Sequence, residues 1–191
     1  MEICDDINEI LCKKVKIMGI IEYFKNLIKP KYKEFTAVNK INFNIEEGEL
    51  VGYIGENGAG KSTTIKMLTG LLTPTSGEVI VNGLVPNEKR IENNKNIGAV
   101  FGQKTQLWWD LPVIESFRLI KQMYKISESD YRKNLKMFTE ILDLEDLLEK
   151  QVKNLSLGQK MRCEIAITFL HNPKIVYLDE PTIGLDVLVK E

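Results

Sequence analysis

The sequence predicts an α/β fold, in which a largely parallel sheet carries helices and receives an inserted helical subdomain. A glycine-rich loop at 55–62 lies between an apolar run and a helix-like run. A second apolar run, at 175–180, ends in two acids. Between 103 and 151, apolar residues recur at helical spacing and nothing resembles a strand. The 191 residues suit one domain, or one domain with a subdomain, that buries its own core.

The composition indicates a soluble globular protein, with 43% hydrophobic and 28% charged residues. The net charge of −1, from 26 basic and 27 acidic residues, gives no electrostatic case for nucleic-acid binding. Cys4, Cys12 and Cys163 fit neither a disulfide framework nor a CxxC metal pattern, so we interpret them as reduced cytosolic thiols. No apolar run approaches the roughly 20 residues of a membrane span. The acidic N-terminus is not typical of a signal peptide.

The N-terminal third predicts strands around a basic helix. Residues 1–12 are expected to include a short edge strand, and 13–33 form a lysine-rich stretch with helical apolar spacing that Pro30 ends. Alternation at 41–45 predicts a half-buried strand. The almost wholly apolar run 50–54 predicts a strand buried on both faces.

The remaining elements follow from periodicity and turn signals. We expect helices at 61–72, 113–126, 131–148 and 157–170, the third starting at Ser127 and the last stopped by Pro173. Strands are expected at 78–81, 97–101 and 175–180, with a tight turn at Asn82 and Gly83.

The glycine loop fits the phosphate-loop pattern G-x-x-x-x-G-K-[ST] at every specified position. Glycines let successive backbone N–H groups face inward as an anion nest, and the following helix points its positive end at the same place. Lys61 is expected to reach the β- and γ-phosphates, Ser62 to ligate Mg²⁺ and Thr63 to reach a phosphate oxygen. The alternative is a glycine-rich turn with an incidental lysine. The predicted nucleotide-binding residues are Gly55, Asn57, Gly58, Ala59, Gly60, Lys61, Ser62 and Thr63.

Two carboxylates stand at the C-terminal end of the run 175–180, the edge where open parallel sheets bind ligands. Asp179 is expected to hold Mg²⁺, and Glu180 to orient and polarise the water that attacks the γ-phosphate. The alternative is that these acids merely end a strand at the solvent.

The segment "LSLGQK" at 155–160 precedes an amphipathic helix, and Ser156 and Gln159 have the spacing of a capping box. By itself this spacing predicts only a well-capped helix. Together with the phosphate loop, a lone Gln103 after a strand, "IVYLDE" and "GLD" at 184–186, it resembles the nucleotide-binding subunits of ABC (ATP-binding cassette) transporters. The resemblance runs from about Tyr32 to the end of the chain.

The resemblance implies a P-loop NTPase core of the RecA-like kind, with a helical subdomain at 103–160 and a small antiparallel β edge. The ABC ATP-binding domain would then occupy 1–191, with 13–33 as a basic amphipathic insertion. The family carries a further strand with a switch histidine beyond residue 191, and the only histidine, His171, precedes the carboxylates. We therefore expect the chain to be a fragment or a C-terminally truncated product, which puts its own turnover in question.

Several residues take roles from the resemblance. Tyr32, or failing it Phe35, corresponds to the aromatic residue that stacks on adenine. Gln103 corresponds to the glutamine that senses Mg²⁺ and couples to the membrane partner. The γ-phosphate held by an opposite subunit would meet the signature residues, and Asp186 would lie at the dimer seam. The signature residues are Ser156, Gly158 and Gln159. Leu157 and Ile183 depart from the family pattern, which has glycine and a small polar residue there.

The segment 100–117 also resembles bacterial ABC-2-type exporter ATPases. Trp108 and Trp109 would then lie where the helical subdomain meets its membrane partner, although burial in the subdomain core is an equal alternative. For 13–33, three interpretations stay open: a solvated surface helix, contact with the cytoplasmic leaflet, or contact with the membrane subunit.

The function implied is an ATP-binding and ATP-hydrolysing subunit on the cytoplasmic face of the membrane, which powers transport through a separate transmembrane permease. Two copies, or this chain and a similar ATPase subunit, would pair with two ATP molecules and Mg²⁺ in the seam, and no nucleic acid is involved. The alternatives are a cassette that binds ATP without turnover and a non-transport ABC ATPase. An unrelated P-loop kinase is disfavoured because "LSLGQ" would have no role in it.

Overall fold

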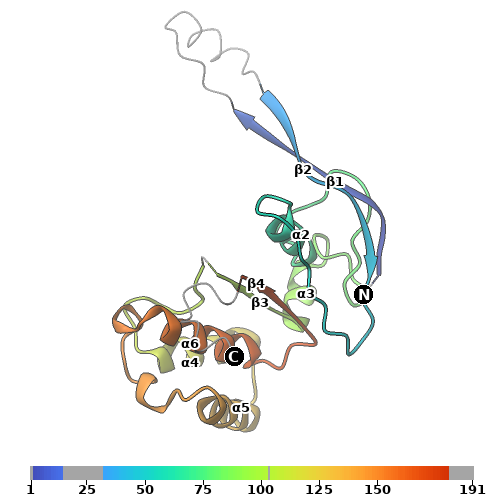
Figure 1. Cartoon of the computed structure of the whole chain (residues 1–191). Coiled ribbons are helices and arrows are strands. Elements are labelled where there is room, and N and C mark those ends of the chain that lie inside the picture. Colours follow the sequence, from blue (N-terminus) through green and yellow to red (C-terminus); the bar gives the residue numbers. More distant parts are fainter. Residues whose placement is uncertain (1, 15–31, 103, 181–191) are drawn as a thin grey trace, which may run out of the picture. The chain divides into compact units, whose positions relative to one another are not determined.

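The computed structural model describes residues 2–14, 32–102 and 104–180, which Figure 1 shows in colour. The chain divides into two compact units, an N-terminal unit of Met1–Asn93 and a C-terminal unit of Asn94–Glu191. The helix expected within 13–33 lies outside the described residues, apart from the two ends of that stretch. Among the described helices, none combines the length and apolar character that a membrane crossing requires.

The N-terminal unit contains a long antiparallel pair, β1 (Glu2–Lys14) and β2 (Tyr32–Asn44), drawn in blue in Figure 1. The antiparallel edge is therefore confirmed, but β2 begins nine residues before the strand that we expected at 41–45. The ladder with β1 continues to the pair Lys14 and Tyr32 and supplies backbone partners there. From Phe35 onward, Val38 is the only fully buried side chain of β2, so no apolar alternation marks the extra length.

Two predicted strands are wrong. The run 50–54 is in no strand, and the side chains of Leu50 and Ile54 are almost fully exposed. The run 78–81 is also irregular, apart from a bridge between Val81 and Leu84 around the expected tight turn. A strand needs the backbone of a neighbour as well as apolar side chains. In the described part of the N-terminal unit no strand pairs with either run.

Helix α2 (Lys61–Leu68) follows the glycine loop and buries Thr64, Met67 and Leu68. It ends four residues before the predicted Leu72, because the chain turns at Gly70 with φ +71°. A further helix, α3 (Arg90–Asn96), was not predicted because its sequence RIENNKN carries no apolar stripe. Its buried Asn93 instead donates from Nδ2 to the carbonyl of Leu68, at 3.3 Å.

The start of α2 is fitted closely against β2. Gly60 is the N-cap residue and has φ +90°, in the left-handed region that favours glycine. A Cβ atom at this position would lie 2.6 Å from the carbonyl oxygen of Ala37 and 2.8 Å from Cγ2 of Val38. Both its backbone conformation and its closeness to β2 therefore require glycine.

The C-terminal unit pairs β3 (Ile97–Phe101) with β4 (Ile175–Asp179) in parallel, and both strands were predicted. Three helices follow the expected positions: α4 (Val113–Tyr124), α5 (Glu128–Ile141) and α6 (Leu157–Phe169). Helix α5 stops before the predicted Leu148, because Asp143 takes a left-handed φ of +49°. Two short 3₁₀ turns, η1 (Glu145–Leu147) and η2 (Val152–Asn154), lead on to α6.

The core of the C-terminal unit lies where α4 and α5 pack with α6 (Figure 1). It is almost wholly apolar, and its buried members are Leu107, Val113, Phe117, Ile120, Tyr131, Leu144, Leu147, Val152, Leu155, Cys163, Ala166, Ile167 and Leu170. Burial of an aliphatic or aromatic side chain contributes about 1.5–3 kcal/mol. This cluster therefore supplies the main stabilisation of the helical part.

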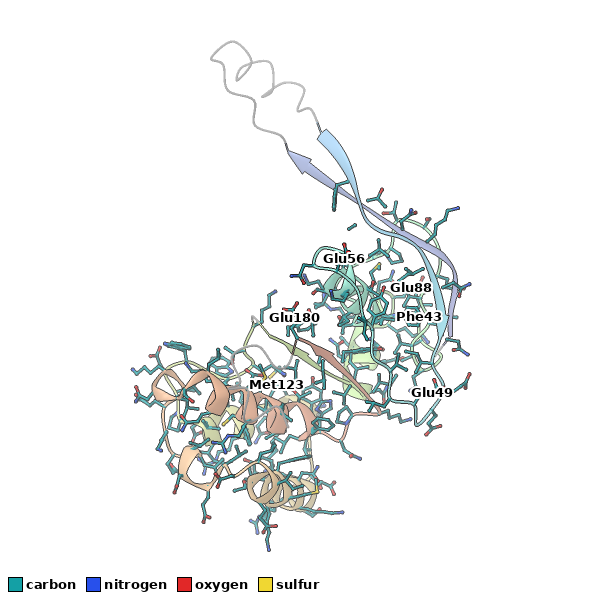
Figure 2. The ribbon with its side chains drawn as sticks, in the orientation of Figure 1. Phe43, Glu49, Glu56, Glu88, Met123 and Glu180 are labelled. Atoms are coloured by element: carbon teal, nitrogen blue, oxygen red, sulfur yellow. The ribbon has the colours of Figure 1, made fainter. Side chains whose placement is uncertain are left out.

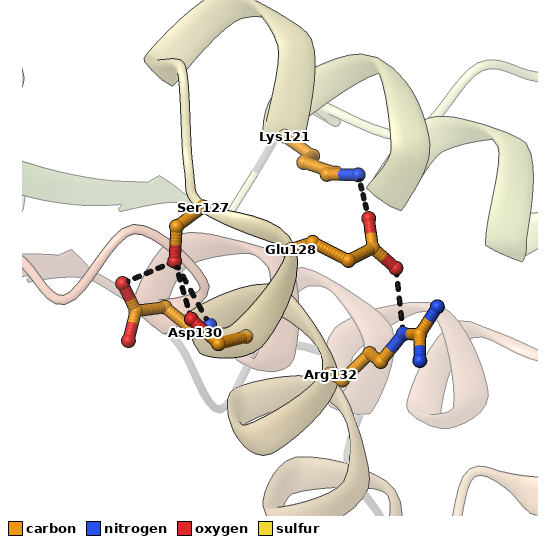
Figure 3. A network of polar contacts seen from close by, with 6 residues as sticks. Lys121, Ser127, Glu128, Asp130 and Arg132 are labelled. Atoms are coloured by element: carbon orange, nitrogen blue, oxygen red, sulfur yellow. Dashed lines mark hydrogen bonds and ion pairs between the residues drawn. The ribbon is translucent and has the colours of Figure 1, made fainter.

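The connection between α4 and α5 is fixed by polar contacts on the surface (Figure 3). Ser127 accepts a hydrogen bond from the backbone N–H of Asp130 at 3.1 Å, so it caps α5 as predicted. Glu128 accepts from Lys121 of α4 and from Arg132 of α5, and these two bonds lower the pKa of its carboxyl. Exposed pairs of this kind contribute little to stability.

His171 links the end of α6 to α4 and β3. Its ring stacks on Tyr124 at a centroid distance of 4.0 Å, and Nε2 donates to the carbonyl of Ile97 at 3.0 Å. Because that carbonyl only accepts, the neutral ring leaves Nδ1 without a proton, and Nδ1 is buried with no partner. Burial lowers the pKa of His171, and the bond to Ile97 only partly opposes this.

We expect His171→Phe to remove the part of the acid-induced loss of unfolding free energy that comes from protonation of this histidine. The unfolded chain takes up a proton as the pH falls through about 6.5, whereas folded His171 takes it up only at lower pH. The free energy of unfolding of the wild type therefore falls between pH 7.5 and 5, whereas that of the variant does not show this fall. The variant keeps an aromatic ring stacked on Tyr124, and the lost hydrogen bond costs it about 1 kcal/mol at every pH. Urea unfolding at several pH values measures the difference, and a difference independent of pH contradicts the assignment.

Gly60→Ala and Gly58→Ala form a matched pair for the loop before α2. Both glycines have φ near +90°, but a Cβ at Gly58 meets nothing within 4 Å. We expect Gly58→Ala to cost about 1–2 kcal/mol from backbone strain alone. Gly60→Ala should cost at least about 1 kcal/mol more, since β2 or α2 must move. Equal losses in urea unfolding would show that β2 does not constrain the loop.

Candidate nucleotide-binding site

The glycine loop forms an exposed turn whose backbone leads directly into α2. Ala59 N–H donates to the carbonyl of Glu56 at 3.1 Å, and the left-handed Gly58 and Gly60 bend the chain on either side. Thr64 N–H closes the first helical turn onto the Gly60 carbonyl at 2.8 Å. The N–H groups of the residues before Thr64 precede the first helical hydrogen bond, so the positive end of α2 is available to an anion at the loop.

The Lys61 side chain folds back over this loop. Its Nζ donates to the carbonyls of Gly55 at 2.6 Å and Glu56 at 2.8 Å. These two bonds hold the ammonium charge at the loop rather than in the solvent. An ammonium has three donors, so it can also meet an incoming phosphate oxygen.

The three hydroxyl residues after Lys61 divide between structure and surface. Thr64 is buried, and its hydroxyl donates to the Gly60 carbonyl at 3.0 Å. Ser62 and Thr63 lie in the first turn of α2 and are half-buried. They are therefore the hydroxyls at the loop that a metal ion or a phosphate can approach, as the sequence suggests.

The predicted acid pair lies at the C-terminal end of β4. Asp179 is opposite Phe101 in the parallel register, and its carbonyl accepts from Gly102 N–H at 2.9 Å. Glu180 follows with φ +53°, which turns the chain out of the strand, and its side chain is exposed (Figure 2). Leu178 is 46% exposed, so this strand is less buried than predicted. The acids belong to the C-terminal unit and the glycine loop to the N-terminal unit, so their convergence on one ligand stays a prediction.

The signature segment forms the predicted capping box at the start of α6. Gln159 N–H donates to Oγ of Ser156 at 3.2 Å, and Ser156 N–H donates to Oε1 of Gln159 at 2.9 Å. The box leaves the N–H groups of Leu157 and Gly158 as the other donors of the first turn. The Leu157 side chain is 51% exposed, so its size does not crowd the core. Anion binding at this helix end, with leucine in place of glycine, stays a prediction.

Trp108 and Trp109 are each 54% exposed, so the alternative that both are core residues is wrong. Lys160, the residue after Gln159, lies over the ring of Trp109 at 4.2 Å from its centroid. Trp108 also borders a groove of about 700 Å³ between α4 and α5. That groove is lined by apolar and charged side chains, including Leu111, Arg118, Leu119, Tyr131 and Leu135.

The remaining predicted residues are only partly placed. Tyr32 is the first residue of β2, and Phe35 lies on the same strand with 55% of its surface exposed. Gln103 and Asp186 lie outside the described residues, as does Ile183.

The sequence interpretation missed a buried carboxylate on α6. Glu164 is only 5% exposed and accepts hydrogen bonds from the segment 105–107. Burial raises the pKa of its carboxyl, although these bonds act in the opposite direction. The available signal was its position, because Glu164 shares a helix face with the buried Met161 and Ile167, three residues before and after it.

Comparison with known proteins shows the family to which the chain belongs. The pattern of the ABC transporter family matches residues 38–183. The probable multidrug ABC transporter ATP-binding protein YbhF of Escherichia coli is 36% identical over 160 residues, which are 84% of this chain and 28% of that protein. The ABC transporter ATP-binding protein NatA of Bacillus subtilis is 32% identical over 157 residues, 82% of this chain and 64% of that protein. The chain thus spans less than two thirds of the length of these relatives.

A solved structure extends the likeness to the fold. The ATP-binding cassette MJ0796, in a dimeric post-hydrolysis state bound to ADP and Pi, superimposes with a TM-score of 0.75 at 28% identity. The match covers 98% of this chain and 77% of that one. Together with the family match, this likeness assigns the chain the P-loop NTPase fold of such cassettes, and the chain belongs to the ABC transporter family of ATP-binding proteins.

Proposed function

We propose that this chain binds and hydrolyses ATP as the nucleotide-binding subunit of an ABC transporter. The observation that carries the proposal is the glycine loop, in which Lys61 is held over a turn that opens onto the N-terminus of α2. This arrangement is a positively charged cradle for a triphosphate, and it lies within the part of the chain that matches the family.

The residues of the two units divide the chemistry between them. The loop N–H groups and Lys61 bind the phosphates, and Tyr32 stacks on the adenine. Ser62, Asp179 and Gln103 are oxygen donors of the kind that Mg²⁺ prefers. When bound, Mg²⁺ neutralises charge on the phosphates. Glu180 accepts a hydrogen bond from the attacking water and orients it.

A second copy of the chain, or a similar ATPase subunit, completes each site. Ser156, Gly158 and Gln159 present the N-terminus of α6 to the γ-phosphate bound by the partner, and Asp186 lies at the seam. The first-turn N–H groups outside the capping box support this role. The dimeric state of MJ0796 with ADP and Pi is a precedent for such a pair.

The membrane partner is a separate transmembrane permease, which places this subunit at the cytoplasmic face of the membrane. The exposed Trp108 and Trp109 on the helical subdomain, 103–160, support a protein contact there. The near-neutral charge argues against a nucleic-acid partner. A contact of the basic stretch 13–33 with lipid or with the permease is proposed beside the alternative of a solvated surface helix.

Lys61→Ala is expected to weaken Mg²⁺–ATP binding about 10- to 100-fold, because a charged hydrogen bond to phosphate contributes about 1.5–3 kcal/mol. Calorimetric titration of the purified chain measures the dissociation constant. Lys66→Ala, in the last turn of the same helix, is the matched control and should leave the affinity unchanged. Unaltered binding in Lys61→Ala contradicts the phosphate-loop assignment.

Glu180→Gln is expected to leave ATP affinity intact while lowering phosphate release at least about 100-fold, since the amide cannot accept a proton from water. ATP-bound dimers should then accumulate and elute earlier in size-exclusion chromatography with Mg²⁺–ATP. Glu149→Gln, at an exposed glutamate of the same unit, serves as the control. Normal turnover in Glu180→Gln would remove this residue from the catalytic role.

A further inference from the structure

We propose that Glu164 is a positioning residue that fastens the segment 105–107, here called the strap, to α6, and so links the signature end of α6 to the carboxylate end of β4. The inference rests on the proposed function, because it concerns how one part of that site senses another. It gives a role to a buried acid that neither the phosphate chemistry nor the capping of α6 uses.

One oxygen of Glu164 holds three consecutive residues of the strap. Its Oε1 accepts from the backbone N–H of Gln106 at 2.7 Å and of Leu107 at 3.3 Å, and from the hydroxyl of Thr105. Leu107 N–H also donates to the Thr105 hydroxyl at 3.0 Å. Glu164 lies about two helical turns beyond Ser156, so a movement of the strap is passed to the signature through a rigid helix.

A second anchor holds the strap to the same helix and to β3. Nε2 of Gln106 donates to Oγ1 of Thr168 at 3.0 Å and to the carbonyl of Ala99 at 3.2 Å. The Thr168 hydroxyl donates in turn to the carbonyl of Glu164 at 2.7 Å. Thr168 is buried and α6 packs on β3 (Figure 1), so this network is partly shielded from water.

The other end of this connection reaches the acid pair. Gly102 N–H donates to the carbonyl of Asp179 at 2.9 Å, and Lys104 N–H donates to the carbonyl of Phe101 at 2.8 Å. The chain that leaves β3 is thus hydrogen-bonded to the tip of β4 at Gly102 and to α6 from Thr105. A change at Asp179 on nucleotide binding has a short route to α6.

Hydrogen bonding to these donors does not by itself require a carboxylate. Desolvating an acid costs free energy, whereas a glutamine could accept the same backbone bonds without a charge. The acid binds its donors through charge-assisted hydrogen bonds, which hold the strap more tightly than neutral ones. A tight link transmits displacement, and this distinguishes coupling from simple filling of the interior.

The chain contains its own reporter of the strap. Its two tryptophans, Trp108 and Trp109, follow Leu107 directly, and Trp109 also lies under Lys160 of α6. If the strap moves with nucleotide binding, intrinsic tryptophan fluorescence changes when Mg²⁺–ATP is added. No label is needed.

The experiment compares the 191-residue chain with Glu164→Leu and Glu164→Gln. Calorimetry measures Mg²⁺–ATP affinity, tryptophan emission measures the strap, and phosphate release gives kcat and KM. We expect Glu164→Leu to bind ATP within about 3-fold of the wild type, to lose most of the fluorescence response, and to lower kcat at least 10-fold with KM unchanged. Glu164→Gln keeps the backbone acceptor but loses the charge, so both of its readouts should lie between those of Glu164→Leu and the wild type.

Controls separate coupling from stability. Cys163→Ala removes a buried core side chain beside Glu164 and should lower the melting temperature without altering either readout. If Glu164→Leu does not fold, Gln106→Leu removes the second anchor and is measured in the same way. An equal loss in Cys163→Ala, or a wild type that binds ATP without a tryptophan response, overturns the inference. So does a normal response in Glu164→Leu. A wild type that does not bind ATP overturns the proposed function itself, and the two failures are therefore distinct.

Discussion

The close approach of Gly60 to the backbone of Ala37 is the constraint on which the candidate phosphate site depends. It fixes where α2 begins, and hence where the positive end of the helix and the Lys61 ammonium lie. A loop that only needed flexibility would not have to lie so close to β2 that a Cβ added at Gly60 would be 2.6 Å from the carbonyl oxygen of Ala37. The glycines therefore serve two purposes, a left-handed backbone and contact with a strand.

In the C-terminal unit, α6 has the corresponding central position. Its N-terminus carries the capping box, one face completes the apolar core, and Glu164 and Thr168 hold the segment that follows β3. His171 ties the end of the same helix to Ile97. A single helix thus connects the proposed partner-facing surface, the core and the strand that ends near the acid pair.

Sequence patterns predicted the elements whose signals are local. The capping box at Ser156 and Gln159, the cap at Ser127 and the short apolar strands β3 and β4 follow from neighbouring residues. The predicted strand at 50–54 failed because pairing depends on a partner that local hydrophobicity cannot specify. Helix α3 was not predicted because it packs through a buried asparagine rather than through an apolar stripe.

The sequence by itself determined the chemistry of the candidate site: which residues could meet phosphate, which could hold a cation, and which family pattern they follow. The tertiary structure decided the contacts between distant segments, such as Gly60 against β2 and the strap against Glu164. Motif spacing is a property of the chain and can be read along it. Burial and long-range hydrogen bonds arise only when segments about 60 residues apart fold together, as Thr105 and Glu164 do.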